Sequence, residues 1–299
     1  MNKREIIARF LKEGILIPPE LLERVNEENY EEILRSLREG DKKTKRKEGG
    51  IKGTEKKTEI SVKEVLDYHS RKYEFLKSLL LRKMDAVSIN KGKKMFSKIG
   101  IIGRVKEITG KGFVVEDVTG EVEVVGEGEV KIGDVIGVKG WFKEGVFLPE
   151  EIIWPDVPLG RETNLPSFIL TYKPLEQMKN KETVIIDVNP EEVEAENPTQ
   201  MSVMYGNERL RILVFKPEED LKEEDVIRFL KRREVPKKEK EIHINYLLED
   251  IPNIIWVIEN RRNWMRNYKG VVLVSTDKES FFVYRKERGG EFLKYNSVI

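Results

Sequence analysis

The chain has 299 residues, of which 36% are charged and 39% apolar, so it is long enough for two or three domains with heavily charged surfaces. Its formal net charge of +1 excludes general attraction to polyanions, so contact with nucleic acid would need a local basic patch. The lack of cysteine excludes disulfides, thiolate zinc sites and cysteine nucleophiles. No stretch approaches the ~18 apolar residues of a membrane span, and the N-terminus lacks a signal-peptide pattern, which predicts a cytoplasmic protein.

The N-terminal part of the chain predicts a small module and a tether. Apolar residues recur at helical spacing in three short stretches of residues 1–40, which indicates a small helical module. Residues 41–58 hold eight Lys or Arg, three acids and three glycines, so residues 41–60 form a flexible basic linker. We expect this linker to bind DNA weakly and to lose that binding as salt rises. Its candidate phosphate contacts are Lys42, Lys43, Lys45, Arg46 and Lys47.

A pre-barrel helical segment follows at residues 61–91. The helix itself is predicted over 61–83, where seven apolar residues from Val62 to Leu80 form one stripe. Ser61, with Glu64 three residues later, has the spacing of a capping box.

In residues 97–157 the spacing of apolar residues changes from the helical period to the period of two that is typical of β-strands. Four apolar segments are separated by Gly-rich turns, and Thr119-Gly120 splits the second segment into a hairpin. Five short strands in this span predict an OB-fold barrel, with an SH3-like barrel as the alternative. Gly100 and Gly103 lie inside the first strand, where a barrel strand bends sharply.

The barrel contains the best candidates for contact with single-stranded nucleic acid, since OB-folds combine stacking aromatics with cations. The candidates are Arg104, Lys106, Lys111, Phe113 and Trp141. The third strand, GEVEVVGEGE, is acidic and opposes phosphate binding. Docking of a protein therefore fits the barrel at least as well.

Residues 158–299 mix apolar strands with a helix at 223–234, which predicts an α/β or α+β domain and makes the whole chain a multi-domain α+β protein. The barrel exit, residues 152–168, is apolar and rich in proline, so we expect the barrel and this domain to move as one unit.

Catalytic residues are scarce in the C-terminal domain. The chain has two histidines, His69 and His243, and neither has a partner at metal-ligand spacing. Asp187 ends an apolar strand and Asn189 follows on the same face, which is read as a capped strand end. Glu259 and Arg261 follow the buried run IIWVI, where α/β domains often bind ligands.

The chain resembles the small subunit of the archaeal D-family DNA polymerase, which is related to the B-subunits of eukaryotic replicative polymerases. Three parts of the chain carry the resemblance, in the same order: VKEVLDYHSRKYEFLKSLLLRKMDAVSI before the barrel, IGIIGRVKEI through VFLPEEIIWPDVPL across it, and YLLEDIPNIIWVIENRRNWMRNYKGVVLVST near the C-terminus. The resemblance implies a phosphoesterase-like C-terminal domain, here shortened by a large deletion.

In that family the last segment carries a metal-binding HxGHxH motif. The resemblance puts Trp256, Ile258, Glu259 and Arg261 at its His, Gly, His and His positions. The family's GNHD element has no counterpart, and VFKPE at 214–218 replaces a histidine-containing element. The former-site positions, now without metal or catalytic role, are Asp187, Asn189, Trp256, Glu259 and Arg261.

The leading functional hypothesis is a non-catalytic accessory protein of DNA replication or repair, without a cofactor. It would dock to a polymerase large subunit or another replication protein and touch single-stranded DNA weakly. The alternatives are a free single-strand-binding OB-fold protein and an enzyme with a rebuilt site at Asp187, Glu259 and Arg261.

Overall fold

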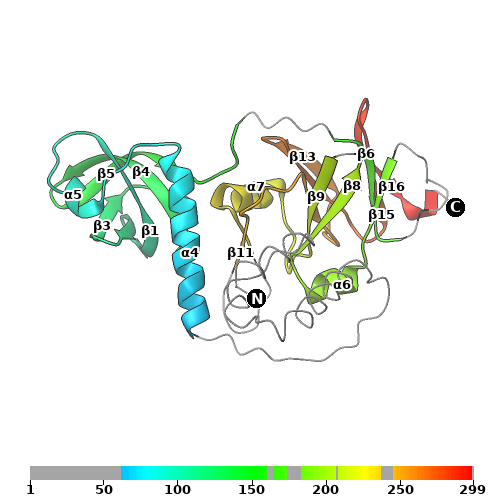
Figure 1. Ribbon diagram of the computed structural model, residues 1–299, viewed down its shortest axis with the longest axis horizontal. Helices are drawn as coiled ribbons and strands as arrows, with labels where there is room; N and C mark the ends of the chain where they lie inside the picture. The colour runs from blue at the N-terminus through cyan, green and yellow to red at the C-terminus, as the bar shows by residue number, and fades with distance from the viewer. Residues whose placement is uncertain are drawn as a thin grey trace, which may run out of the picture. The chain divides into compact units, whose positions relative to one another are not determined.

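The computed structural model describes residues 62–159, 165–173, 175, 183–206, 208–236 and 245–297 (Figure 1). The predicted helical module at 1–40, the linker at 41–60, Ser61 of the capping box and His243 lie outside the described residues. Within the described part, no helix combines the length and the apolar character that crossing a membrane requires.

Helix α4 (Val62–Leu81) confirms the predicted pre-barrel helix. Its apolar stripe packs against the barrel, because Leu76 and Leu80 are buried with Ile102 and Val135. Leu66, from the first half of the stripe, is 62% exposed, whereas Tyr73 and Leu79 in the second half are partly buried. The short helix α5 (Ile89–Gly92) follows.

The predicted five-stranded barrel is confirmed. Its strands pair in the closed order β1-β2-β3-β5-β4, and aromatic and branched side chains fill the interior. Asp117 Oδ1 accepts hydrogen bonds from the backbone N–H groups of Thr119 and Gly120, which fixes the predicted hairpin turn. The strands are β1 (Ile99–Thr109), β2 (Gly112–Asp117), β3 (Gly120–Val125), β4 (Val135–Lys143) and β5 (Val146–Ile153).

The two glycines of β1 allow close backbone approach. A Cβ atom at Gly100 would lie 2.4 Å from the carbonyl oxygen of Asp85, and one at Gly103 would lie 2.5 Å from that of Glu116. Any larger residue would therefore push a neighbouring segment away from the barrel wall.

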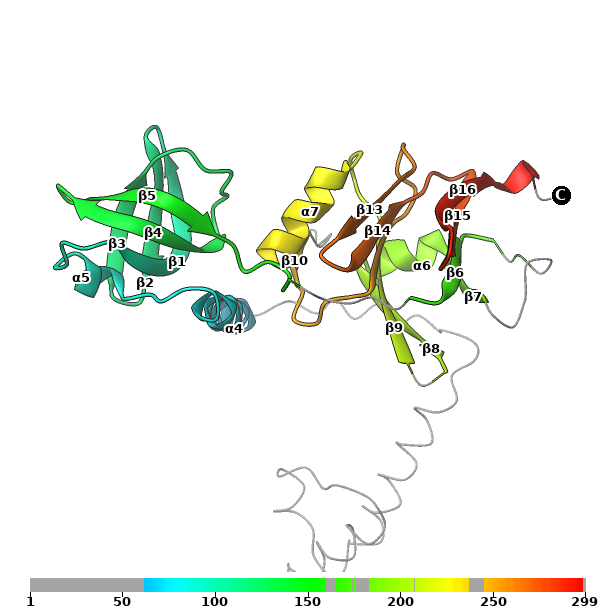
Figure 2. The ribbon, with the colours of Figure 1, turned by 90° about the horizontal axis from the view of Figure 1, so that it is seen from above.

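The described C-terminal part contains two large sheets and the two-stranded pair β10-β11. The five-stranded sheet has the order β13-β14-β12-β9-β8, and the four-stranded sheet has the order β16-β15-β6-β7 (Figure 2). Strand β12 is parallel to both β9 and β14, and β6 is parallel to β7. The bounds are β6 (Ser167–Thr171), β7 (Thr183–Asp187), β8 (Thr199–Tyr205), β9 (Glu208–Phe215), β12 (Ile254–Val257), β13 (Trp264–Tyr268), β14 (Val271–Ser275), β15 (Ser280–Arg285) and β16 (Gly289–Lys294).

One apolar core joins these two sheets. Phe168, Ile212, Trp256 and Phe282 all contribute to it, from both sheets. The other face of the five-stranded sheet is covered by helix α7 (Glu223–Arg232), which confirms the helix predicted at 223–234. The smaller elements are α6 (Pro190–Ala195), β10 (Glu234–Val235), β11 (Tyr246–Leu247) and the 3-10 turn η2 (Tyr295–Ser297).

Buried charges connect the barrel region with the segment around α7 and β10. Lys72 Nζ on α4 lies 2.7 Å from Glu234 Oε1 and donates to the Gly133 carbonyl at 3.1 Å. Arg232 Nε donates to Asp134 Oδ1 at 3.0 Å. The four charged residues come from three elements and one loop, so their contacts hold α4 and the β3–β4 loop against the C-terminal part.

The apolar exit from the barrel is also packed. Val157 is buried in the core under α7, and the guanidinium of Arg232 lies 5.1 Å from the ring centre of Trp154. Asp156 accepts a hydrogen bond from Tyr268 Oη at 3.1 Å and pairs with Lys269. A rigid connection between the barrel and the C-terminal part would have such contacts. Their movement as one unit stays a prediction.

Candidate functional site

The carboxyl ends of the parallel strands form the candidate site, because ligands of open α/β sheets bind there. Strand β6 leads into Tyr172, β9 into Lys216, β12 into Ile258 and Glu259, and β14 into Thr276. We call Tyr172, Lys216, Trp256, Glu259 and Thr276 the strand-end cluster.

An aromatic pair fills the middle of the strand-end cluster. Trp256 is fully buried, and its ring stacks on that of Tyr172 at a centre distance of 5.4 Å and an angle of 16°. Trp256 Nε1 donates to Thr276 Oγ1 at 2.8 Å. Two large rings and a hydroxyl therefore occupy the space between the strand ends.

The phenol of Tyr172 has its hydrogen bonds satisfied. Its Oη donates to the Thr276 carbonyl at 3.0 Å and accepts from the backbone N–H of Glu259 at 3.0 Å. Burial raises the pKa of Tyr172 well above its ordinary value, so the phenol stays neutral. It holds two strand ends together and is a poor base or nucleophile.

Two lysines neutralise Glu259. Its Oε2 lies 3.1 Å from Lys216 Nζ and 3.5 Å from Lys278 Nζ, and its side chain is 16% exposed. Lys216 also pairs with Glu194 at 2.6 Å, and its hydrogen bonds to Glu194 and Glu259 raise the pKa of the Lys216 ammonium. The carboxylate therefore meets two cations from the protein itself, which compete with binding of an external cation.

The other former-site positions serve the fold or face solvent. Asp187 is exposed at the end of β7. Asn189 Oδ1 accepts the Glu191 N–H at 3.1 Å, so it caps the N-terminus of α6, the helix that follows β7. Arg261 is exposed, and its backbone N–H donates to Asp220. Thus the structure brings only Trp256 and Glu259 into the strand-end cluster.

The turn that follows β12 is also structural. Asn260 is 3% exposed and donates to both the Leu221 carbonyl and Ser275 Oγ at 2.8 Å. Its Oδ1 accepts the Leu221 N–H at 3.0 Å. Within the described ranges, no three His, Cys, Asp or Glu side chains come together as a potential metal site.

Sequence reasoning missed Tyr172, Thr276 and Lys216. In the sequence, Lys216 is marked only by its place in the middle of VFKPE. Tyr172 is marked only by its place directly after the strand sequence SFILT. Since Tyr172 and Thr276 lie 104 positions apart in the chain, no local pattern could show that they meet.

The barrel candidates for nucleic-acid contact are mostly engaged elsewhere. Arg104 pairs with Glu116, and Lys106 pairs with Glu121 at 2.6 Å. Phe113 was wrongly assigned as a stacking residue, because it is 1% exposed in the barrel core. Lys111 is exposed, and Trp141 is 42% exposed with Lys98 Nζ 5.7 Å from its ring centre.

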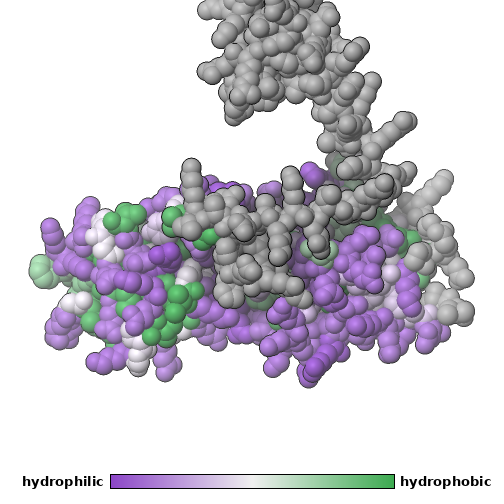
Figure 3. Space-filling model, turned by 90° about the horizontal axis from the view of Figure 1, so that it is seen from below, coloured by the Kyte–Doolittle hydropathy of each residue, from purple (hydrophilic) through white to green (hydrophobic). Residues whose placement is uncertain are grey.

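The barrel surface is instead partly apolar, as the space-filling view shows (Figure 3). Phe96 is fully exposed just before β1, and Val118 and Ile132 are 84% and 69% exposed in turns. Exposed aromatic side chains next to a polar surface are common at sites of protein contact.

No protein-family model matches this sequence, and a search of curated proteins finds no match.

Proposed function

We propose that this chain is a non-catalytic accessory subunit of a DNA replication or repair complex, similar to the small subunit of the D-family DNA polymerase. The observation that carries the proposal is a closed barrel followed by a two-sheet domain whose strand ends hold Trp256, Tyr172 and Thr276. The resemblance to the D-family small subunit implies the same order, a barrel followed by a C-terminal domain, with the metal ligands of that domain replaced by other residues.

The barrel's topology supports this proposal. The strand order β1-β2-β3-β5-β4, with β3 and β5 pairing in parallel, is the order of an OB-fold and favours it over an SH3-like barrel. The paired cations Arg104 and Lys106 and the buried Phe113 argue for protein docking over binding of single strands. Neutralisation of Glu259 by two lysines argues against an enzyme with a rebuilt site there.

Sedimentation velocity of the chain mixed with an archaeal D-family polymerase large subunit tests the docking role. We expect one faster-sedimenting complex, and we expect Phe96→Ser to weaken it about tenfold, because a fully exposed aromatic residue is suited to anchor an interface. Leu159→Ser, which removes an 83% exposed apolar side chain outside the barrel strands, is the matched control. Independent sedimentation of the two proteins would contradict the proposal.

A further inference from the structure

Strand β8 is an uncharged sheet edge. It forms one end of the five-stranded sheet, and its seven residues, TQMSVMY, include no charged side chain, although 36% of the chain is charged. The other long edge strands of the described sheets carry charges: Arg266 on β13, Asp187 on β7, and Glu291 and Lys294 on β16. Charges on an edge discourage pairing with another chain, and β8 lacks this protection.

The position of β8 is firmly fixed. It pairs with β9 along its whole length, from Thr199 opposite Val214 to Tyr205 opposite Glu208. Met201 and Val203 pack on the core between the sheets, which sets the register. Among the described strands none pairs with the other side of β8, so no described strand satisfies its outer backbone groups.

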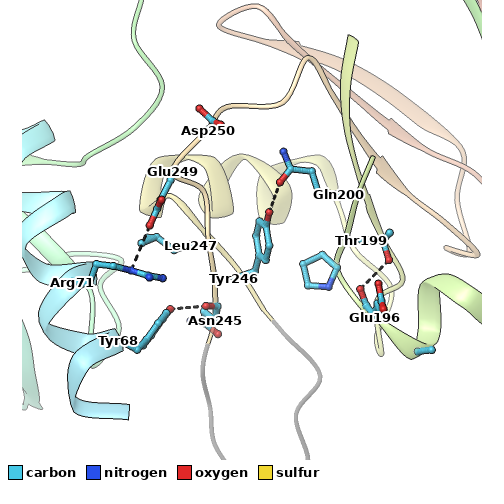
Figure 4. A pocket seen from close by; sticks show the side chains of 12 residues that line it. Tyr68, Arg71, Glu196, Thr199, Gln200, Asn245, Tyr246, Leu247, Glu249 and Asp250 are labelled. Atoms are coloured by element: carbon cyan, nitrogen blue, oxygen red, sulfur yellow. Dashed lines mark hydrogen bonds and ion pairs between the residues drawn. The ribbon is translucent and has the colours of Figure 1, made fainter. Parts of the chain in front are cut away.

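A groove lies beside the start of β8. It has a volume of about 700 Å³ and lies between α4, β11 and the first residues of β8 (Figure 4). Tyr246 Oη donates to Gln200 Oε1 at 2.6 Å across it. A space of this size is within the range that accommodates a small ligand or several side chains.

Among its described lining residues the groove is acidic. They include the acids Glu196, Glu249 and Asp250 against one base, Arg71. Arg71 Nε lies 3.6 Å from Glu249, and Asp250 pairs with Arg211 at 3.3 Å. Both pairs are at the surface and therefore weak, so they leave the groove receptive to an added cation.

We propose that β8 binds an extended segment of a partner protein by strand addition, with a basic side chain of that segment placed in the acidic groove. Backbone hydrogen bonds to β8 supply affinity, and the groove supplies selectivity. Met204, which is 64% exposed, offers a flexible apolar contact on the same strand. This surface is distinct from the barrel and does not depend on the identity of the polymerase partner.

A partner segment fits this surface better than a second copy does. Antiparallel pairing of two β8 strands would bring Met204 and Tyr205 of one copy towards the groove of the other. Neither Met204 nor Tyr205 is charged, so the acidic residues of the groove would gain no positive partner from a second copy.

A labelled nine-residue peptide of alternating valine and lysine is the probe, with binding to the full chain followed by fluorescence anisotropy. We expect Met204→Lys to weaken binding about tenfold or more, because it adds a like charge to the edge. Val118→Lys adds the same charge at an 84% exposed turn of the barrel and is expected to leave binding unchanged. Glu249→Gln is expected to weaken binding several-fold.

Two peptide controls separate strand addition from simple charge attraction. A valine–lysine peptide N-methylated at alternate residues keeps its charge but loses the hydrogen bonds of one edge, so we expect no binding. A valine–glutamate peptide is expected to bind at least about tenfold more weakly. Equal binding of the N-methylated peptide, or no effect of Met204→Lys, would overturn the proposal. Sedimentation of the chain as a dimer that Met204→Lys dissociates would also overturn it, in favour of a second copy.

Discussion

Replacing Lys72 by alanine is expected to lower the free energy of unfolding by about 3–5 kcal/mol, because it leaves a buried carboxylate without its counter-charge. Lys72 is 7% exposed and Glu234 6% exposed, with their charged atoms 2.7 Å apart. The loss also removes the hydrogen bond from Lys72 Nζ to the Gly133 carbonyl. Urea denaturation of the full chain measures the change.

The matched control is the double variant Lys72→Met with Glu234→Leu. It removes both charges and keeps similar side-chain volumes, so we expect it to recover most of the stability lost in the single variant. A double variant as unstable as the single one would show that Lys72 acts through packing and not through its charge.

The loss of unfolding free energy that Lys72→Ala causes should also depend on pH. Burial raises the pKa of Glu234, and removal of Lys72 takes away the cation that opposes this shift. A carboxyl group whose pKa is higher in the folded state than in the unfolded state destabilises the fold when it is ionised. The deficit should therefore be small near the unfolded pKa of glutamate, about 4.3, and grow as the pH rises above it. A deficit that is constant with pH would contradict an electrostatic origin.

Trp256→Ala is expected to cost about 3–5 kcal/mol of unfolding free energy, because it opens a cavity in the core that joins the two sheets. Trp256 is fully buried, stacks on Tyr172 and donates to Thr276. Tyr172→Phe keeps the stacked ring but leaves the Glu259 N–H without its acceptor, so it should cost about 1–3 kcal/mol.

Trp141→Ala is the matched control for Trp256→Ala. Trp141 is 42% exposed on the barrel, so its removal should cost less than about 1 kcal/mol. Thermal or urea denaturation monitored by circular dichroism compares the three variants. Equal losses for Trp141→Ala and Trp256→Ala would contradict a structural role specific to the strand-end cluster.

The barrel was predictable from sequence because its hairpins β1–β2, β2–β3 and β4–β5 are local and turn at glycines. The Thr119-Gly120 hairpin and the buried run Ile254–Val257 follow from patterns within a few residues. Phe113 was misassigned because an aromatic residue in an alternating strand can face either side, and only the register of β2 against β1 and β3 puts it inside.

The candidate site was less predictable because its contacts are distant in sequence. Tyr172 meets Thr276 through the packing of one sheet on another, and Lys72 meets Glu234 through the docking of a helix. The alternative of a rebuilt enzyme site grouped Asp187, Glu259 and Arg261. Asp187 and Arg261 are exposed, whereas Glu259 is 16% exposed and pairs with two lysines. Glu259 has a positive φ of 52°, a local feature that no sequence periodicity predicts.

The central claim is that the strand-end cluster fills the site with protein side chains and supports no metal-dependent hydrolysis. The direct test is an assay of the purified chain on single-stranded DNA and on a generic phosphodiester, with Mn²⁺ or Mg²⁺ added. We predict no turnover, and no difference between the natural chain and Asp187→Ala. Metal-dependent turnover that Asp187→Ala abolishes would contradict the account.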